Sequence, residues 1–108
     1  MIIYLSGKIT GDWDYKEKFR KKESVLICAG HAVLNPAKLP EGMPREKYMP
    51  ICLAMLDSAD AIYMIGDWQE SEGARIEYKY AIYQGKAAYF EKPMELKELE
   101  EIKNDREH

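Results

Sequence analysis

The fold of this chain is decided by residues 71–81, which read SEGARIEYKYA. They follow the apolar run Ala61–Ile65, which is typical of a buried strand, so Gly73 lies near a turn from strand to helix. A helix N-terminus offers backbone N–H groups and the positive end of the helix dipole to an anion. Glu77 falls about one turn inside this helix, where its carboxylate can reach the same end. The stretch predicts a ligand site, although a glutamate that only serves the helix dipole would have the same spacing.

Strands and helices alternate along the rest of the chain. The predicted strands are Ile2–Leu5, His31–Leu34, Asp60–Ile65 and Lys86–Phe90. The predicted helices run from Asp12 or Asp14 to Ala29, from about Lys47 to Ser58, from Gly73 to Gln84 and from Met94 to about Lys103. Because Pro50 is acceptable only in a first turn, the regular part of the second helix is expected to start near Tyr48 or Met49. This alternation predicts an α/β fold with a small parallel sheet of about four or five strands and helices on both faces.

Length and composition predict a small cytoplasmic domain. The 108 residues suit one domain, at residues 1–103, followed by a frayed tail at 104–108. Sixteen Lys and Arg against 19 Asp and Glu give a net charge of −3, without the basic footprint that duplex nucleic acid requires. No signal peptide is recognisable, and no apolar run approaches the roughly 18 residues of a membrane span. Cys28 and Cys52 lack metal-ligand spacing, so we expect free thiols, no metal and no cofactor.

The loop after the first strand contains Gly7, Lys8, Ile9, Thr10 and Gly11. Glycines let a backbone approach a ligand closely, and successive N–H groups can form an anion-binding nest. Lys8 and Thr10 would add a positive charge and a hydroxyl donor. The loop lacks the Gly-Lys-Ser/Thr sequence of a Walker A motif, and an ordinary turn between strand and helix has a similar composition.

Three further residues are expected near the same edge of the sheet, because the carboxyl ends of parallel strands lie together. Asn35 directly follows the second strand, although Asn-Pro is also an ordinary turn signal. Trp13 is either a lid on the ring of a ligand or an anchor in the core. Trp68 lies in a polar loop and is expected to be exposed.

These motifs resemble a known superfamily. YLSGKITG at residues 4–11, AD at 59–60 and the pattern SxGxxxExxxA at 71–81 are similar to the nucleoside 2-deoxyribosyltransferases. NP at residues 35–36, CLAML at 52–56 and GAR at 73–75 resemble the small DUF4406 proteins of bacteria and phages. The resemblance extends to about Tyr89. It implies a flavodoxin-like, Rossmann-like three-layer sandwich that is usually dimeric or larger.

The resemblance also implies an activity at the N-glycosidic bond of 2′-deoxynucleosides or their 5′-monophosphates. Glu77 matches the glutamate that attacks C1′, and Tyr4 matches the tyrosine that orients it. The nucleotide N-glycohydrolases of the superfamily hold phosphate with a Gly-Ser-Ile-Arg-Gly loop and a serine ahead of the helix glycine. The loop from Gly7 to Gly11 and Ser71, with Gly73, take those places here, which favours a phosphorylated substrate. Hydrolysis and transfer both remain open, and Asn35, Trp13 and Trp68 are candidates for contacts with the base.

One position departs from the superfamily. Many members have an aspartate eight residues before the Ala-Asp strand, as proton donor or sugar ligand, and here that position is Cys52. Neither Asp57 nor Asp60 is an obvious replacement. An alternative function is therefore a non-catalytic module that binds or sequesters a nucleotide or a nucleotide signal.

The helix that carries Glu77 predicts that the chain assembles with further copies of itself. It also contains Tyr78, Tyr80, Ile82 and Tyr83, more apolar and aromatic surface than one face of a sheet needs. Since aromatic residues are enriched at interfaces, we expect a homodimer or a higher oligomer.

Overall fold

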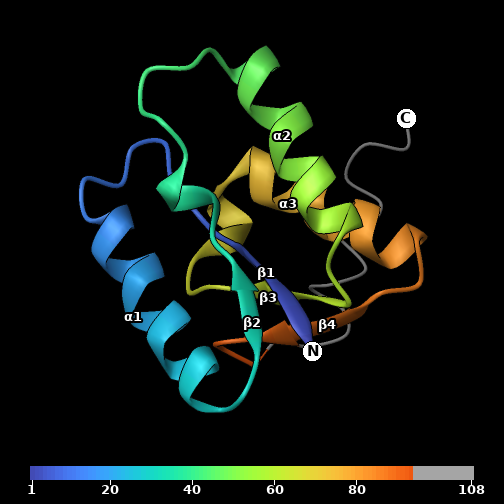
Figure 1. Ribbon diagram of the computed structural model, residues 1–108. Helices are drawn as coiled ribbons and strands as arrows, with labels where there is room; N and C mark the ends of the chain where they lie inside the picture. The colour runs from blue at the N-terminus through green and yellow to red at the C-terminus, as the bar shows by residue number, and fades with distance from the viewer. Residues whose placement is uncertain (94–108) are drawn as a thin grey trace.

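Each predicted strand forms one strand of a single parallel sheet in the computed structural model, which describes residues 1–93 (Figure 1). The strands are β1 (Ile2–Ser6), β2 (Ala32–Leu34), β3 (Ala61–Met64) and β4 (Ala87–Phe90). The helices are α1 (Tyr15–Cys28), α2 (Arg45–Asp57) and α3 (Glu72–Tyr83), with short 3-10 turns η1 (Pro36–Lys38) and η2 (Trp68–Glu70). The predicted α/β class is confirmed. The helix expected from Met94 to Lys103 and the tail at 104–108 lie outside the described residues.

The order of the strands, β2-β1-β3-β4, creates a switch point between β1 and β3. The chain leaves β1 for β2 on one side and then crosses back to β3 on the other. Helix α1 therefore covers one face of the sheet, while α2 and α3 pack together on the other (Figure 1). In α/β sheets a crevice opens at such a switch point, outside the carboxyl ends of the strands.

Alternate residues of β1 supply the two faces of the core. Tyr4 belongs to the cluster under α2 and α3, together with Ile62 and Met64 of β3. Leu5 belongs to the opposite cluster and packs with Phe19 of α1. This period of two fixes which side chains of β1 point toward α3.

The structure contradicts the expectation for Trp68 and one of the two alternatives for Trp13. Trp68 was expected to be exposed, but it is 1% exposed, and its ring centroid lies 5.1 Å from that of Tyr78 and 6.0 Å from that of Phe90. It is a core residue and cannot contact a base. Trp13 is 94% exposed, so the core-anchor alternative is wrong.

Helix α2 begins at Arg45, earlier than the sequence predicted. We expected Pro50 to restrict the regular helix to residues after about Tyr48, but Pro50 lies inside it. The backbone N–H groups of Lys47 and Tyr48 donate to the carbonyl of Pro44, at 2.9 and 3.0 Å, and close a turn before Pro50 is reached. This early start places Arg45 at the first position of α2. Within residues 1–93, no helix has the length and apolar character needed to cross a membrane.

Candidate active site

Glu77 is a buried acid in the middle of α3. Ser71 caps this helix, since its Oγ accepts a hydrogen bond from the backbone N–H of Ala74 at 3.1 Å. Glu77 is the sixth residue of the helix and is only 6% exposed. Its carboxylate faces β1 rather than the free amides at the helix end. The interpretation of Glu77 as a surface glutamate that serves the helix dipole is therefore wrong.

Two hydroxyl groups of β1 hold the carboxylate of Glu77. Tyr4 Oη donates to Oε2 at 2.8 Å, and Ser6 Oγ donates to Oε1 at 2.7 Å. The two donors are two residues apart on one strand, so both point toward α3. The interaction of Tyr4 with Glu77 was expected from the family resemblance. The contribution of Ser6 was missed, because the predicted strand ended at Leu5.

Burial shifts the pKa of the Glu77 carboxyl group. It raises the pKa of Glu77 from its ordinary value of 4.5 to about 7, although the hydrogen bonds from Ser6 and Tyr4 act in the opposite direction. Burial, followed by the nearby charge of Glu77, raises the pKa of Tyr4 well above its usual range, so Tyr4 stays a neutral donor. A carboxyl group with a pKa near neutrality, fixed at both oxygens, can serve as a nucleophile or as a base.

Glu77 and Tyr4 line a cavity of about 480 Å³ at the carboxyl ends of the strands. Five other predicted site residues also line it, namely Gly7, Ile9, Thr10, Ser71 and Gly73. The cavity thus brings together the loop after β1 and the N-terminus of α3, which lie about 60 residues apart in the sequence.

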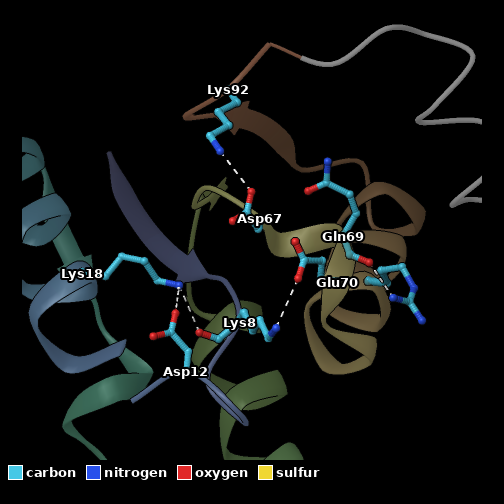
Figure 2. Close-up of polar contacts among 8 residues, drawn as sticks. Lys8, Asp12, Lys18, Asp67, Gln69, Glu70 and Lys92 are labelled. Carbon is cyan, nitrogen blue, oxygen red and sulfur yellow. Dashed lines mark hydrogen bonds and ion pairs between the residues drawn. The ribbon is translucent and has the colours of Figure 1, made fainter. Parts of the chain in front are cut away.

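Three predicted site residues do not line this cavity. Lys8 lies at its rim, where its Nζ donates to Glu70 Oε1 at 3.2 Å (Figure 2). Asn35 Oδ1 accepts the backbone N–H of Ala37 at 2.9 Å and caps η1. Gly11 has a φ of 81°, a conformation that suits glycine in a turn. Trp13, the third candidate for a base contact, does not line the cavity either.

A lysine of α1 also holds the loop after β1. Lys18 Nζ donates to a carboxylate oxygen of Asp12 and, at 3.4 Å, to the carbonyl of Lys8 (Figure 2). The loop is therefore tied to α1 as well as to Glu70, which restricts its backbone beside the cavity.

Helix α2 contributes residues that the sequence did not identify. Arg45, Tyr48 and Met49 line the cavity. A second hollow of about 430 Å³ adjoins it. The two share the residues Ile9, Thr10, Pro36, Arg45 and Tyr48. The early start of α2 explains why Arg45 was missed, because the predicted helix began two residues later.

Cys52 lies behind the site rather than in it. Its side chain is fully buried in the cluster that contains Tyr4, and it does not line the cavity. Burial raises the pKa of the Cys52 thiol to about 11, and the hydroxyls of Tyr4 and Tyr48 oppose this shift only in part. The thiol is protonated at neutral pH.

Neither nearby aspartate takes the place of an acid at Cys52. Asp57 accepts hydrogen bonds from Tyr80 Oη at 2.7 Å and Gln84 Nε2 at 2.9 Å on the surface. Asp60 accepts the backbone N–H of Ile2 at the amino end of β1. Within residues 1–93, no three His, Cys, Asp or Glu side chains cluster as metal ligands do, and the absence of a required metal or cofactor stays a prediction.

Comparisons with known proteins agree with this architecture. A solved 2-deoxyribosyltransferase from the psychrotolerant bacterium Bacillus psychrosaccharolyticus superimposes with a TM-score of 0.69 at 23% sequence identity, over 90% of this chain and 79% of that chain. The likeness confirms the predicted flavodoxin-like fold. No curated protein matches the sequence. The model of the family described as a domain of unknown function, DUF4406, matches residues 1–90. The chain therefore belongs to the DUF4406 family.

Proposed function

We propose that this protein cleaves or transfers at the N-glycosidic bond of a 2′-deoxynucleoside 5′-monophosphate, with Glu77 as the nucleophile. The observation that carries the proposal is the buried carboxylate of Glu77, fixed by Tyr4 and Ser6 in the wall of a cavity. The description of the structurally similar protein as a 2-deoxyribosyltransferase supports glycosyl transfer as the class of reaction.

The proposed reaction has two steps. An ionised oxygen of Glu77 bonds to C1′ while the base departs with the electron pair of the glycosidic bond and takes a proton from solvent. In the second step the oxygen of water or a nitrogen of a second base bonds to C1′, the C1′–O bond to Glu77 breaks with its electron pair returning to the carboxylate, and the attacking group gives a proton to solvent. Attack by water releases 2-deoxyribose 5-phosphate and makes the protein a hydrolase, whereas attack by a second base makes it a transferase. The missing 2′-hydroxyl eases the build-up of positive charge at C1′.

Tyr4 and Ser6 have the same role in both steps. Their hydrogen bonds orient the carboxylate and favour its charged form, which attacks in the first step and departs in the second. Burial works in the other direction, because it removes water from the carboxylate. The balance keeps Glu77 reactive yet partly ionised at neutral pH.

The N-terminus of α3 is the proposed seat of the 5′-phosphate. The hydroxyl of Ser71 accepts from Ala74, so its own hydrogen is available to a ligand. The amide of Gly73, at the second position of α3, has no acceptor within the helix. Thr10 adds a hydroxyl from the facing loop, and all three residues line the cavity.

A second candidate function is a non-catalytic module that binds or sequesters a nucleotide or a nucleotide signal. The observation that favours it is Cys52, which stands where many superfamily members have an aspartate and is here a buried, protonated thiol outside the cavity. Such a thiol cannot give the leaving base a proton.

One experiment separates these functions. Purified protein is incubated with each 2′-deoxynucleoside 5′-monophosphate, with and without a second free base, and the products are separated by chromatography. We expect free base, or exchanged nucleotide when an acceptor is present. Binding measured by calorimetry without either product would reject the enzyme and leave the binding module, and no binding would reject both.

A further inference from the structure

We infer that Arg45 binds the anionic group of a ligand at this site and that the carboxylate of Glu72 competes with that group for Arg45. The inference rests on the proposed function in one respect, because it takes the ligand's anion to be the 5′-phosphate. It concerns binding alone and does not require that the glycosidic bond be broken.

Among the described residues, Arg45 is the one Lys or Arg in the lining of the main cavity. It also lines the adjoining hollow. Three carboxylates line the main cavity, those of Glu70, Glu72 and Glu77. Among the side chains that line the cavity, an anion therefore meets more negative than positive groups, and Arg45 is the one lining cation that can attract it.

Arg45 is bonded to the start of α3. Its Nη2 donates to Glu72 Oε1 at 3.2 Å, and the two side chains are 55% and 42% exposed. Glu72 is the first residue of α3, beside the Ser71 hydroxyl and the Gly73 amide. A phosphate bound at this helix end would thus lie next to the present partner of Arg45.

An exchange of partners is favourable on physical grounds. Solvent-exposed ion pairs contribute little to stability, so the Arg45–Glu72 pair is easily opened. A guanidinium forms a stronger, often bidentate pair with a phosphate, which carries more charge than a carboxylate. The carboxylate of Glu72 would then lie near the phosphate, and repulsion between like charges would oppose binding.

Lys8 does not take this role. It lies outside the lining of the cavity, and its ammonium is bonded to Glu70 at the rim (Figure 2). The sequence favoured Lys8 as the phosphate ligand, whereas the structure places Arg45 in the cavity.

The test is calorimetry of the full-length chain with inorganic phosphate, a 2′-deoxynucleoside 5′-monophosphate and the matching nucleoside. We expect Arg45→Gln to weaken binding of the monophosphate about tenfold and to leave nucleoside affinity within about twofold. Glu72→Gln alone should strengthen binding of the monophosphate about threefold. When it is combined with Arg45→Gln, its strengthening effect should be smaller. The matched controls are Arg20→Gln and Glu17→Gln, since these residues form an exposed pair on α1 away from the cavity.

The outcomes separate this inference from the proposed function. Equal affinity of the wild type for monophosphate and nucleoside, or no binding of phosphate or monophosphate, overturns the inference. So does an Arg45→Gln variant that binds the monophosphate like the wild type, even if base is released. Arg45-dependent binding of the monophosphate without release of base supports the inference and rejects the enzymatic step. Circular dichroism checks that each variant is folded.

Discussion

At the scale of residues, Glu77, Tyr4 and Ser6 act as one unit. The two hydroxyls satisfy both carboxylate oxygens in a site that water barely reaches. Without them the burial of an ionised carboxylate would be far less favourable, because a buried charge needs hydrogen-bonding partners. The reactivity that we propose for Glu77 therefore depends on its two neighbours as much as on its own position.

The first prediction concerns the pH dependence of kcat/KM. Only ionised Glu77 attacks, so kcat/KM should rise with pH and level off above about 7, the pKa of this group. Ser6→Ala and Tyr4→Phe each remove a hydrogen bond that favours the charged form, so each should move the midpoint to higher pH by about 1 unit. Tyr80→Phe is the matched control, since Tyr80 bonds the exposed Asp57. If the midpoint of the rise in kcat/KM stays at the wild-type pH in both variants, the role of Ser6 and Tyr4 in favouring ionised Glu77 is contradicted.

The second prediction concerns stability. The pKa of Glu77 is about 7 in the fold against an ordinary value of 4.5, so between these pH values the unfolded chain releases its proton first. The free energy of unfolding should therefore fall as pH rises through this window, by up to about 3 kcal/mol from this group alone. Glu77→Gln should remove that loss. Urea denaturation of both proteins from pH 4 to 8 should show the variant gaining on the wild type, and a constant difference would refute the prediction.

At the scale of elements, Gly7 and Gly73, which both line the cavity, differ in how closely their neighbours pack. A Cβ at Gly7 would lie 3.2 Å from both Ile65 Cβ and Phe19 Cζ, closer than such atoms normally approach. A Cβ at Gly73 would lie 3.7 Å from Met49 Sδ, an ordinary contact. A methyl group at Gly7, directly after β1, would thus displace Ile65 or Phe19, whereas Gly73 has room for one.

This difference gives a matched pair of substitutions. Gly7→Ala should lower the free energy of unfolding by about 1–3 kcal/mol, because Phe19 and Ile65 must move. Gly73→Ala should leave it unchanged or raise it by about 0.5 kcal/mol, since alanine favours a helix. Chemical denaturation measures both. A Gly7→Ala variant as stable as Gly73→Ala would show that the contacts at Gly7 relax without cost.

Most elements could be predicted from the sequence because their signals are local. Strands followed from short apolar runs, Glu77 from its spacing after Gly73, and the partnership of Tyr4 with Glu77 from the family resemblance. The failures came from contacts across the chain. Trp68 has polar neighbours in the sequence, and contacts with distant residues, among them Tyr78 of α3 and Phe90 of β4, make it a core residue. Arg45 was missed for a local reason, because the proline in α2 suggested a later start for the helix.

Asn35 and Ser6 show the same limit at the edge of the sheet. Asn35 lies at the carboxyl end of a strand as expected, yet its side-chain oxygen is used by the cap of η1. Ser6 continues β1 by one residue, which is enough to point its hydroxyl at Glu77. Strand ends are decided by pairing between strands, which a single sequence does not display.

At the scale of the whole molecule, the homodimer or larger assembly stays a prediction. Of the four residues expected at the interface, Tyr78 is buried and Tyr80 bonds Asp57, while Tyr83 is 90% exposed. Light scattering should show a mass of at least twice that of one chain, and Tyr83→Arg should lower it. Trp13→Arg, which alters an equally exposed aromatic residue, is the control. A monomeric wild type would contradict the prediction. The cytoplasmic location is equally untested.

The topology of the sheet explains why so small a domain can hold a reactive carboxylate. The switch between β1 and β3 leaves a crevice, and α3 packs over β1 so that Glu77 meets Tyr4 and Ser6 there. The loop after β1, the start of α2 and the N-terminus of α3 complete the cavity. The buried carboxylate and the cavity are thus placed by strand order rather than by any one motif.

The most direct measurement is the release of free base from 2′-deoxynucleoside 5′-monophosphates by the wild type and by Glu77→Gln, followed by chromatography. We predict that the wild type releases base and that the variant, although folded, is at least about a thousandfold slower, because it lacks the nucleophile. Glu46→Gln, on the exposed side of α2, should match the wild type. A Glu77→Gln variant that releases base as fast as the wild type would contradict the assignment of Glu77 as the nucleophile.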